Sequence, residues 1–198
     1  MSSSRFARAL VSGLALSFLT APAAFADDPT TTESTSTTET TTTDPWAETP
    51  RTLALRVRVA HSRAVARRWS ALMGNPMPVV RRPTIEFESL LGRRRWWAHR
   101  WARKAHRARS DGRRPPHLRA WLCIHGFEAS WHDPSAPYYG GLQMDLTFQR
   151  RYGLRLLRQK GTADHWTRWE QMWVAERAHR SGRGFYPWPN TARYCGLI

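Results

Sequence analysis

The sequence is poor in acidic residues and in lysine, and it is rich in arginine. Acidic residues number 15 against 31 basic ones, which gives a formal net charge of +16. Only Lys104 and Lys160 are lysines, so guanidinium groups carry nearly all the positive charge, and these groups bind phosphate and carboxylate in a fork geometry. The imbalance is unsuited to a cationic partner and favours an anionic polymer: nucleic acid, acidic lipid or an acidic cell-wall polymer.

Long apolar runs are also scarce. The one candidate, residues 9–19, follows two arginines and precedes the small-residue pattern Ala-Phe-Ala at 24–26. This order is typical of a secretory signal peptide, and the run is too short to span a bilayer permanently. We therefore expect residues 1–26 to be a signal peptide and the protein to be secreted, extracellular or associated with the cell wall. An uncleaved N-terminal anchor is the alternative. In both cases the rest of the chain is exported, which argues against chromosomal DNA as the partner.

Cysteine occurs only twice, as Cys123 and Cys195. In an oxidising compartment two cysteines most simply form a disulfide, and closing a loop of about 70 residues stabilises a chain by about 4 kcal/mol in the chain-entropy model. Two free buried thiols are the alternative.

Apolar residues are nearly absent from residues 27–50, which are mostly Thr, Ser, acids and Pro. Such a stretch cannot bury enough surface to fold, so a disordered linker or wall-spanning stalk is expected. Helical periodicity begins after it. One apolar stripe runs from Leu55 to Met73 and ends at a Gly-Asn-Pro sequence, and a second begins near Thr84 and continues to Ala108. Residues 51–112 are thus predicted to form a basic helical hairpin.

The most basic stretch is residues 92–114, in which tryptophan alternates with arginine. It is suited to an anionic wall polymer or to a membrane surface, and a solvated helix face explains it equally well. It contains no recognisable nucleic-acid-binding motif, so sequence-specific binding of nucleic acid is not expected.

The last segment, residues 117–198, is richer in Gly, Pro and aromatics and contains both cysteines. Period-two alternation is scarce, so a mainly α domain is predicted, with at most a β-turn or hairpin at residues 138–143. Thr167 and Glu170 form a capping-box pattern at the start of a helix that should end at Gly182. Met172 and Trp173 in that helix are expected in the core.

Glu128 is the lone acid of the most aromatic stretch, CIHGFEASWHDPSAPYYGGLQMD (123–145). It should lie in the last turn of a helix over residues 117–128. The helix dipole and nearby aromatic rings both disfavour an ionised carboxylate there, which suits the acid that cleaves a glycosidic bond. A surface Glu paired with an arginine is the alternative, and spacing by itself favours it.

Several motifs in order resemble the lysozyme-like core of the resuscitation-promoting factors, secreted transglycosylase-like proteins that act on peptidoglycan. They are Cys123, Glu128, Trp131 and YYGGLQ (138–143), followed by AER (175–177), YPWP (186–189) and Cys195. YYGGLQ also resembles the Gly-Leu-x-Gln turn of goose-type lysozymes and lytic transglycosylases. The resemblance implies a small lysozyme-like domain with one disulfide, preceded here by the hairpin and the linker.

The chain departs from that family pattern in two places. In the family core the catalytic Glu usually follows its Cys directly, whereas residues 124–127 separate the two here. The stretch between Glu128 and Trp131 is also shorter than in better-known members. The disulfide is therefore expected to attach at a different helical turn.

The resemblance implies that Glu128 is the general acid/base that cuts the β-1,4 bond between N-acetylmuramic acid and N-acetylglucosamine. Sugar rings pack on aromatic side chains, glycines allow close approach of backbone, and an amide can bind an N-acetyl group or a hydroxyl. The expected substrate-binding residues are Trp131, Tyr138, Tyr139, Gly140, Gly141, Gln143 and Trp188.

The second step of the reaction stays open at this point. Hydrolases add a second carboxylate, whereas a single Glu suffices for lytic transglycosylation, in which the 6-hydroxyl of the muramic acid attacks. The acids available for that role are Asp133, Asp145, Asp164 and Glu176. Of these, Asp145 suits a helix cap and Glu176 suits a pair with Arg177 or Arg180.

No metal and no cofactor is expected. His117, His125 and His132 lie near Cys123, but their spacing matches no familiar zinc motif. Peptidoglycan glycan strands are the expected partner of a monomeric enzyme. The rival functions are a catalytically inactive wall-binding protein and a cationic protein that disrupts membranes.

Overall fold

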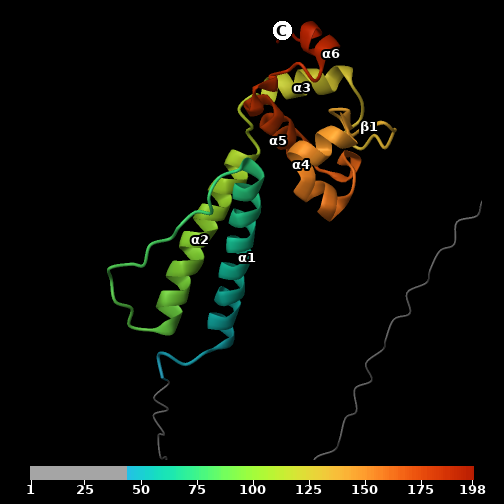
Figure 1. Cartoon of the computed structure of the whole chain (residues 1–198). Coiled ribbons are helices and arrows are strands. Elements are labelled where there is room, and N and C mark those ends of the chain that lie inside the picture. The colour runs from blue at the N-terminus through green and yellow to red at the C-terminus, as the bar shows by residue number, and fades with distance from the viewer. Residues whose placement is uncertain (1–43) are drawn as a thin grey trace, which may run out of the picture. The chain divides into compact units, whose positions relative to one another are not determined.

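The computed structural model describes residues 44–198, and these fold mainly as α-helices, as predicted (Figure 1). The expected signal peptide and residues 27–43 of the expected linker lie outside the described residues. Among the helices of residues 44–198, none combines the length and the apolar character needed to span a membrane.

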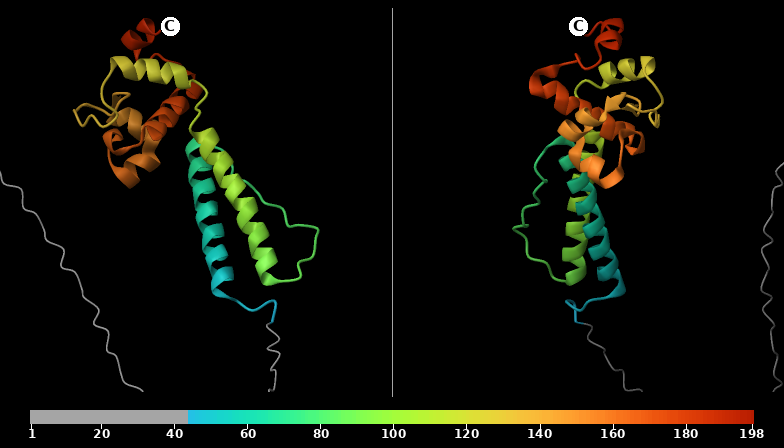
Figure 2. Two further views of the ribbon diagram at one scale, coloured as in Figure 1. Left: turned by 180° about the vertical axis from the view of Figure 1, so that it is seen from behind. Right: turned by 45° about the vertical axis from the view of Figure 1, so that its right-hand side comes forward.

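The first two helices form a hairpin. Helix α1 covers Pro50–Met73, and α2 covers Leu90–Gly112. Thr49 caps α1 through a capping box with Thr52, Pro50 occupies its first turn, and Gly74 ends it in the left-handed region at φ 75°. The two helices lie side by side along most of their length, as all the views show (Figure 2).

Helix α2 begins later than the sequence suggested. The expected start near Thr84 is wrong, because residues 84–89 are not helical and Ser89 is the N-cap, accepting a hydrogen bond from the backbone N–H of Gly92 at 3.2 Å. The backbone N–H of Leu90 donates to the carbonyl oxygen of Pro45 at 2.9 Å. The first residue of α2 is thus hydrogen-bonded to the segment that precedes α1.

The apolar stripes of the hairpin face each other. Ala66 of α1 packs with Trp101 and Ala108 of α2, and half-buried Trp69 and Trp97 extend this contact. The tryptophans of α2 thus pack largely within the hairpin. Its arginines mostly remain exposed.

The C-terminal region consists of short elements around one core. Strands β1 and β2 pair antiparallel, with Tyr138 opposite Asp145 and Tyr139 opposite Met144, so the small hairpin expected at residues 138–143 is present. The elements after the hairpin are α3 (Leu118–Phe127), β1 (Tyr138–Tyr139), β2 (Met144–Asp145), α4 (Leu146–Lys160), the 3-10 helix η1 (Ala163–His165), α5 (Arg168–Ala178), the π-helix η2 (His179–Arg183) and α6 (Pro189–Tyr194).

The caps and the kink of these helices have local causes. Thr167 and Glu170 form the predicted capping box at the start of α5. Helix α4 is kinked at Gly153, where a Cβ atom would lie 2.6 Å from the ring of Trp166. The core contains fully buried Trp121, Trp166 and Met172, among others.

The predicted disulfide between Cys123 and Cys195 is confirmed. It joins α3 to the residue that follows α6, with 6.0 Å between the two Cα atoms. Because the two cysteines are 72 residues apart in sequence, the link removes a large loop-closure entropy from the unfolded chain.

Arg177 connects the hairpin to the core. Its Nη1 donates to the carbonyl oxygen of Leu72 in α1 at 2.8 Å, and its Nε donates to that of Tyr152 in α4 at 2.6 Å. Burial, followed by the nearby charges of Arg155 and Arg180, lowers the pKa of Arg177 to about 10. Trp173 adds a second connection, because its Nε1 donates to the carbonyl oxygen of Gly112 at 2.7 Å.

Candidate functional site

Glu128 lies at the C-terminal end of α3, one residue beyond the last helical residue Phe127. Its side chain is half-buried, and its Oε1 accepts a hydrogen bond from the Oγ1 of Thr191 at 2.9 Å. Thr191 is a buried residue of α6, the helix that the Cys123–Cys195 disulfide holds against α3. The covalent link therefore secures both halves of this hydrogen-bonded pair.

A surface cavity of about 280 Å³ opens next to this carboxylate. Four of the predicted site residues meet there: Glu128, Tyr138, Gln143 and Trp188. The remaining lining residues all come from the segment that leads into and begins α6, namely Pro187, Pro189, Asn190 and Thr191. Glu128 is the only acid of this lining.

The two aromatic side chains of the cavity differ in their freedom. Trp188 is only 5% exposed, and its Nε1 donates to the carbonyl oxygen of Leu142 at 2.6 Å, so it forms a fixed wall. Tyr138 is 50% exposed and offers its ring to a ligand. The cavity thus combines a rigid apolar wall with an accessible aromatic surface.

Gln143 is held in an uncommon backbone conformation. Its φ of 46° lies in the left-handed region, which non-glycine residues rarely adopt. Its backbone N–H donates to the carbonyl oxygen of Gly140 at 3.0 Å, and its Nε2 donates to the same oxygen and to Oδ2 of Asp133, at 3.0 and 2.8 Å. Strain maintained in this way is characteristic of functional sites.

These contacts also orient the side-chain amide of Gln143. A carboxylate and a backbone carbonyl can only accept, so the NH₂ group must face Asp133 and Gly140. The amide oxygen is left as an acceptor for a ligand. Hydrogen bonds from Ser135 and then from Gln143 lower the pKa of Asp133, which keeps this orienting group ionised.

The other predicted substrate-binding residues are not part of the lining of this cavity, and Trp131 lines a different one. Trp131 stacks on His125 with 3.9 Å between ring centroids, and Tyr139 packs against the core. A Cβ atom on Gly140 would lie 2.6 Å from Oε1 of Gln171, and one on Gly141 would lie 2.7 Å from Nδ1 of His125. The packing beneath the turn therefore accounts for both glycines.

The four acids considered for a second catalytic role all have other contacts. Asp133 orients Gln143, and Asp145 caps α4 by accepting from the backbone N–H of Phe148 at 2.6 Å. Asp164 is buried in η1, where its Oδ2 lies 3.4 Å from Nε2 of His165. None of the four contributes to the cavity that contains Glu128.

The expected pairing of Glu176 with Arg177 or Arg180 is wrong. It is fully buried, and its Oε1 accepts from the backbone N–H of His117 and from Nε1 of Trp121, both at 2.8 Å. Its Oε2 lies 3.2 Å from Nδ1 of His117. The cause is the inward direction of this face of α5, which places Glu176 beneath the start of α3.

The three histidines near Cys123 separate in the structure. His125 contacts the carbonyl oxygen of Gly141 at 3.1 Å through Nδ1, and His132 contacts that of Asp164 at 2.8 Å. His117 instead meets Glu176 and His179, with their ligand atoms within 4.8 Å of one another. Sequence reasoning missed this group, although the Glu-x-x-His spacing at 176–179 places both side chains on one helix face.

No protein-family model matches this chain, and neither does any curated protein or solved structure.

Proposed function

We propose that the protein is a secreted enzyme that cleaves the β-1,4 bond between N-acetylmuramic acid and N-acetylglucosamine in peptidoglycan. The observation that carries this proposal is the pairing of Glu128 with Gln143 and Tyr138 at one cavity. The ordered motifs that resemble the lysozyme-like core of the resuscitation-promoting factors give the same assignment. A lysozyme-like fold for residues 117–198 is part of the proposal.

In the proposed reaction Glu128 donates its proton to the glycosidic oxygen as the bond to the anomeric carbon breaks. Thr191 orients the carboxyl group through the contact to its Oε1, which leaves the other oxygen for the substrate. The amide oxygen of Gln143 accepts from an N-acetyl N–H or a hydroxyl, and the ring of Tyr138 packs against a sugar face. These contacts fix the position of the leaving oxygen relative to the acid.

Lytic transglycosylation is the proposed outcome, because Glu128 is the only acid that lines the cavity. Hydrolysis by a retaining or inverting mechanism needs a second carboxylate within about 5 to 9.5 Å of the first. With one Glu, the 6-hydroxyl of the muramic acid attacks the anomeric carbon, and the Glu128 carboxylate takes up the hydroxyl proton. The product then ends in a 1,6-anhydro sugar.

The test is the Glu128→Gln variant on purified sacculi. The amide keeps the size of the side chain and an acceptor for Thr191, but it cannot donate the proton, so the release of muropeptides should fall by a factor of about 10² to 10⁴. Glu86→Gln, in the exposed connection between α1 and α2, is the matched control and should cleave at the parent rate.

Three results decide between the functions. Parent activity in Glu128→Gln would refute the site, and an inactive parent would leave the wall-binding function in its place. Mass analysis of the released ends distinguishes the chemistry, because a 1,6-anhydro end marks a transglycosylase and a reducing end a hydrolase.

A second proposed function, adhesion to an anionic wall polymer, rests on the hairpin. Residues 50–114 contain eighteen Arg and Lys residues but only three acids. Most of these cations are exposed, and Trp97 and Trp101 pack toward α1, which leaves them poorly placed to insert into a membrane. The hairpin would hold the enzyme on the wall while the cavity cleaves the glycan.

Adhesion is tested by replacing exposed arginines of α2 in the full chain. A variant with Arg93→Gln, Arg95→Gln and Arg103→Gln should bind sacculi more weakly and with a shallower salt dependence, because fewer counterions are released. Its activity on soluble glycan strands, which still contain the bond that is cut, should match that of the parent. Leakage of anionic lipid vesicles at the parent's working concentration would instead favour the membrane-active function.

A further inference from the structure

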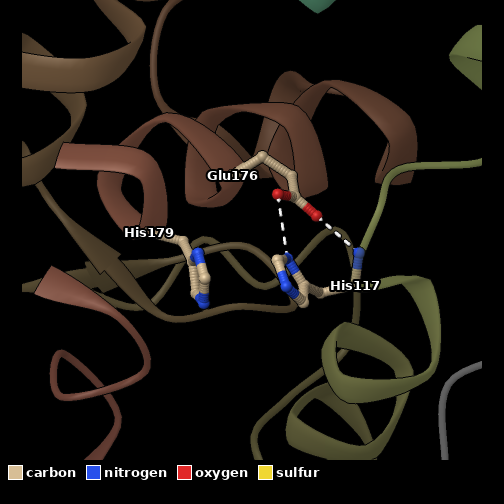
Figure 3. A group of neighbouring side chains, drawn as sticks. All are labelled: His117, Glu176 and His179. Carbon is tan, nitrogen blue, oxygen red and sulfur yellow. Dashed lines mark hydrogen bonds and ion pairs between the residues drawn. The ribbon is translucent and has the colours of Figure 1, made fainter. Parts of the chain in front are cut away.

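A buried carboxylate and two histidines form a compact group at the start of α3, whereas Glu128 lies at its other end. Glu176 comes from the last part of α5, His179 begins the π-helix η2, and His117 is the N-cap of α3 (Figure 3). The three side chains face one another, and their ligand atoms all lie within 4.8 Å.

Among the described residues, no arginine or lysine forms an ion pair with Glu176. It is completely buried, and its contacts are the backbone and ring of His117 and the indole of Trp121. Two neutral donors satisfy Oε1, but they do not neutralise a buried charge, which is costly without an ion of opposite sign. The positive charge must come from the imidazole side of the group or from a bound cation.

The imidazoles are suited to bind a cation. Each ring offers one nitrogen to the group, and these two nitrogens lie within 4.8 Å of one another and of the Glu176 carboxylate. The Nδ1 of His117 lies 3.2 Å from Oε2 of Glu176, close to the separation of about 3.4 Å between two ligands of a tetrahedral zinc ion. Both rings are half-exposed, so an ion can enter and a solvent ligand can complete the shell.

The backbone supports this arrangement. The chain leaves α5 as a π-helix that begins at His179, and such turns occur frequently at functional sites. Glu176 and His179 are three positions apart, the spacing that places a carboxylate and an imidazole of one helix on a shared metal. The third ligand, His117, comes from the start of α3.

We propose that Glu176, His117 and His179 form a zinc site that fastens the start of α3 to the end of α5. Zn²⁺ takes the position between Oε2 and Nδ1 and displaces any proton on that nitrogen, and His179 is the third protein ligand. The ion neutralises the buried carboxylate. The role of the ion is structural. The site lies outside the cavity of Glu128, and the proposal does not depend on cleavage of peptidoglycan.

The first measurement is calorimetric titration of chelator-treated full chain with zinc sulfate. The two cysteines are joined to each other, so no thiol can account for binding. A single saturable site per chain is expected. His179→Phe keeps a ring against Phe185 but removes both nitrogens, and it should weaken zinc binding by more than about 100-fold.

Two further variants isolate the site. His99→Ala, at an exposed position of α2, is the matched control and should bind as the parent does. Glu176→Gln keeps an acceptor for His117 and Trp121 but loses the charge, and it should bind zinc as weakly as His179→Phe. Circular dichroism checks that each variant is folded.

Spectroscopy identifies the ligands and supplies the decisive alternative results. Bound Co²⁺ should give the intense visible bands of a four-coordinate site, and X-ray absorption of the zinc form should show nitrogen and oxygen ligands at about 2.0 to 2.2 Å. The proposal is overturned if the parent shows no saturable site, or if a folded His179→Phe binds zinc within about threefold of the parent.

Discussion

Gly141 occupies a position at which an added methyl group has no room. An ideal Cβ atom would lie 2.7 Å from Nδ1 of His125 and 2.8 Å from Cε3 of Trp131, both inside the 3.0 Å that real Cβ atoms essentially never cross. The two rings are stacked at 3.9 Å, and His125 also contacts the carbonyl oxygen of Gly141. Neither ring can therefore move away without losing another contact.

Gly141→Ala should consequently lower the free energy of unfolding by about 1 to 3 kcal/mol, the usual cost of overpacking. Gly126→Ala is the matched substitution, because no atom from outside its own helical turn lies within 4 Å of its added Cβ and the residue is inside α3. Replacing a helical glycine by alanine should instead raise that free energy, by up to about 1 kcal/mol.

Urea denaturation of both variants and the parent measures these changes. The opposite signs are the essential result, since a general sensitivity of the domain would move both variants in one direction. The reasoning fails if Gly141→Ala unfolds within about 0.5 kcal/mol of the parent. It also fails if Gly126→Ala is destabilised as much as Gly141→Ala.

Three further predictions concern stability. Replacing Cys123 and Cys195 together by alanine should lower the free energy of unfolding by about 4 kcal/mol in urea, as expected for a loop of this length, and a change below about 1 kcal/mol would contradict it. Arg177→Met should cost about 2 kcal/mol or more in the same assay, because two partly buried backbone carbonyls lose their donor, and a neutral result would show that water replaces it. Burial would raise the pKa of Glu170, but the hydrogen bonds from Lys160 and Thr167 outweigh it and the pKa is lowered. The stability that Glu170 contributes is therefore present above the ordinary pKa of 4.5 and is lost as the pH falls through the lower pKa of the folded state. Lys160→Met should reduce this loss of stability in melting curves recorded at decreasing pH, and an unchanged pH profile would refute the prediction.

Local chemistry explains why much of the fold could be predicted. The caps at Thr167 and Gly74 depend on side chains and glycines within a few residues, and they are found where the sequence indicated. The Cys123–Cys195 pair followed from there being only two cysteines. The turn at residues 140–143 followed from its glycines, and four of the expected residues do line one cavity.

The failures arise where contacts distant in sequence decide. Helix α2 could have begun near Thr84, but Ser89 provides the cap and the Leu90 N–H finds its acceptor at Pro45, far away in the chain. Glu176 has arginine neighbours in sequence, yet the helix face on which it lies is turned toward His117. No local pattern specifies such a direction, because it depends on which side of α5 the core covers.

The position of Trp131 could not be predicted from the sequence either. An aromatic residue shortly after the proposed catalytic Glu suggests a surface for sugar binding, and in the structure its ring stacks on His125 and lines a cavity other than that of Glu128. Composition identifies an aromatic residue near the site, whereas only the path of the loop decides which side of the turn the ring contacts.

The disulfide also makes the candidate site conditional on the redox state of its surroundings. Glu128 directly follows α3 and its partner Thr191 lies in α6, and the bond between Cys123 and Cys195 is the covalent tie between these two elements. A reduced chain would keep every side chain of the cavity but would lose that tie, and it should therefore cleave sacculi more slowly when assayed with a thiol reductant than without. Under the proposed function, oxidation would then be the step that completes the site, and a chain in a reducing compartment would be the less active form.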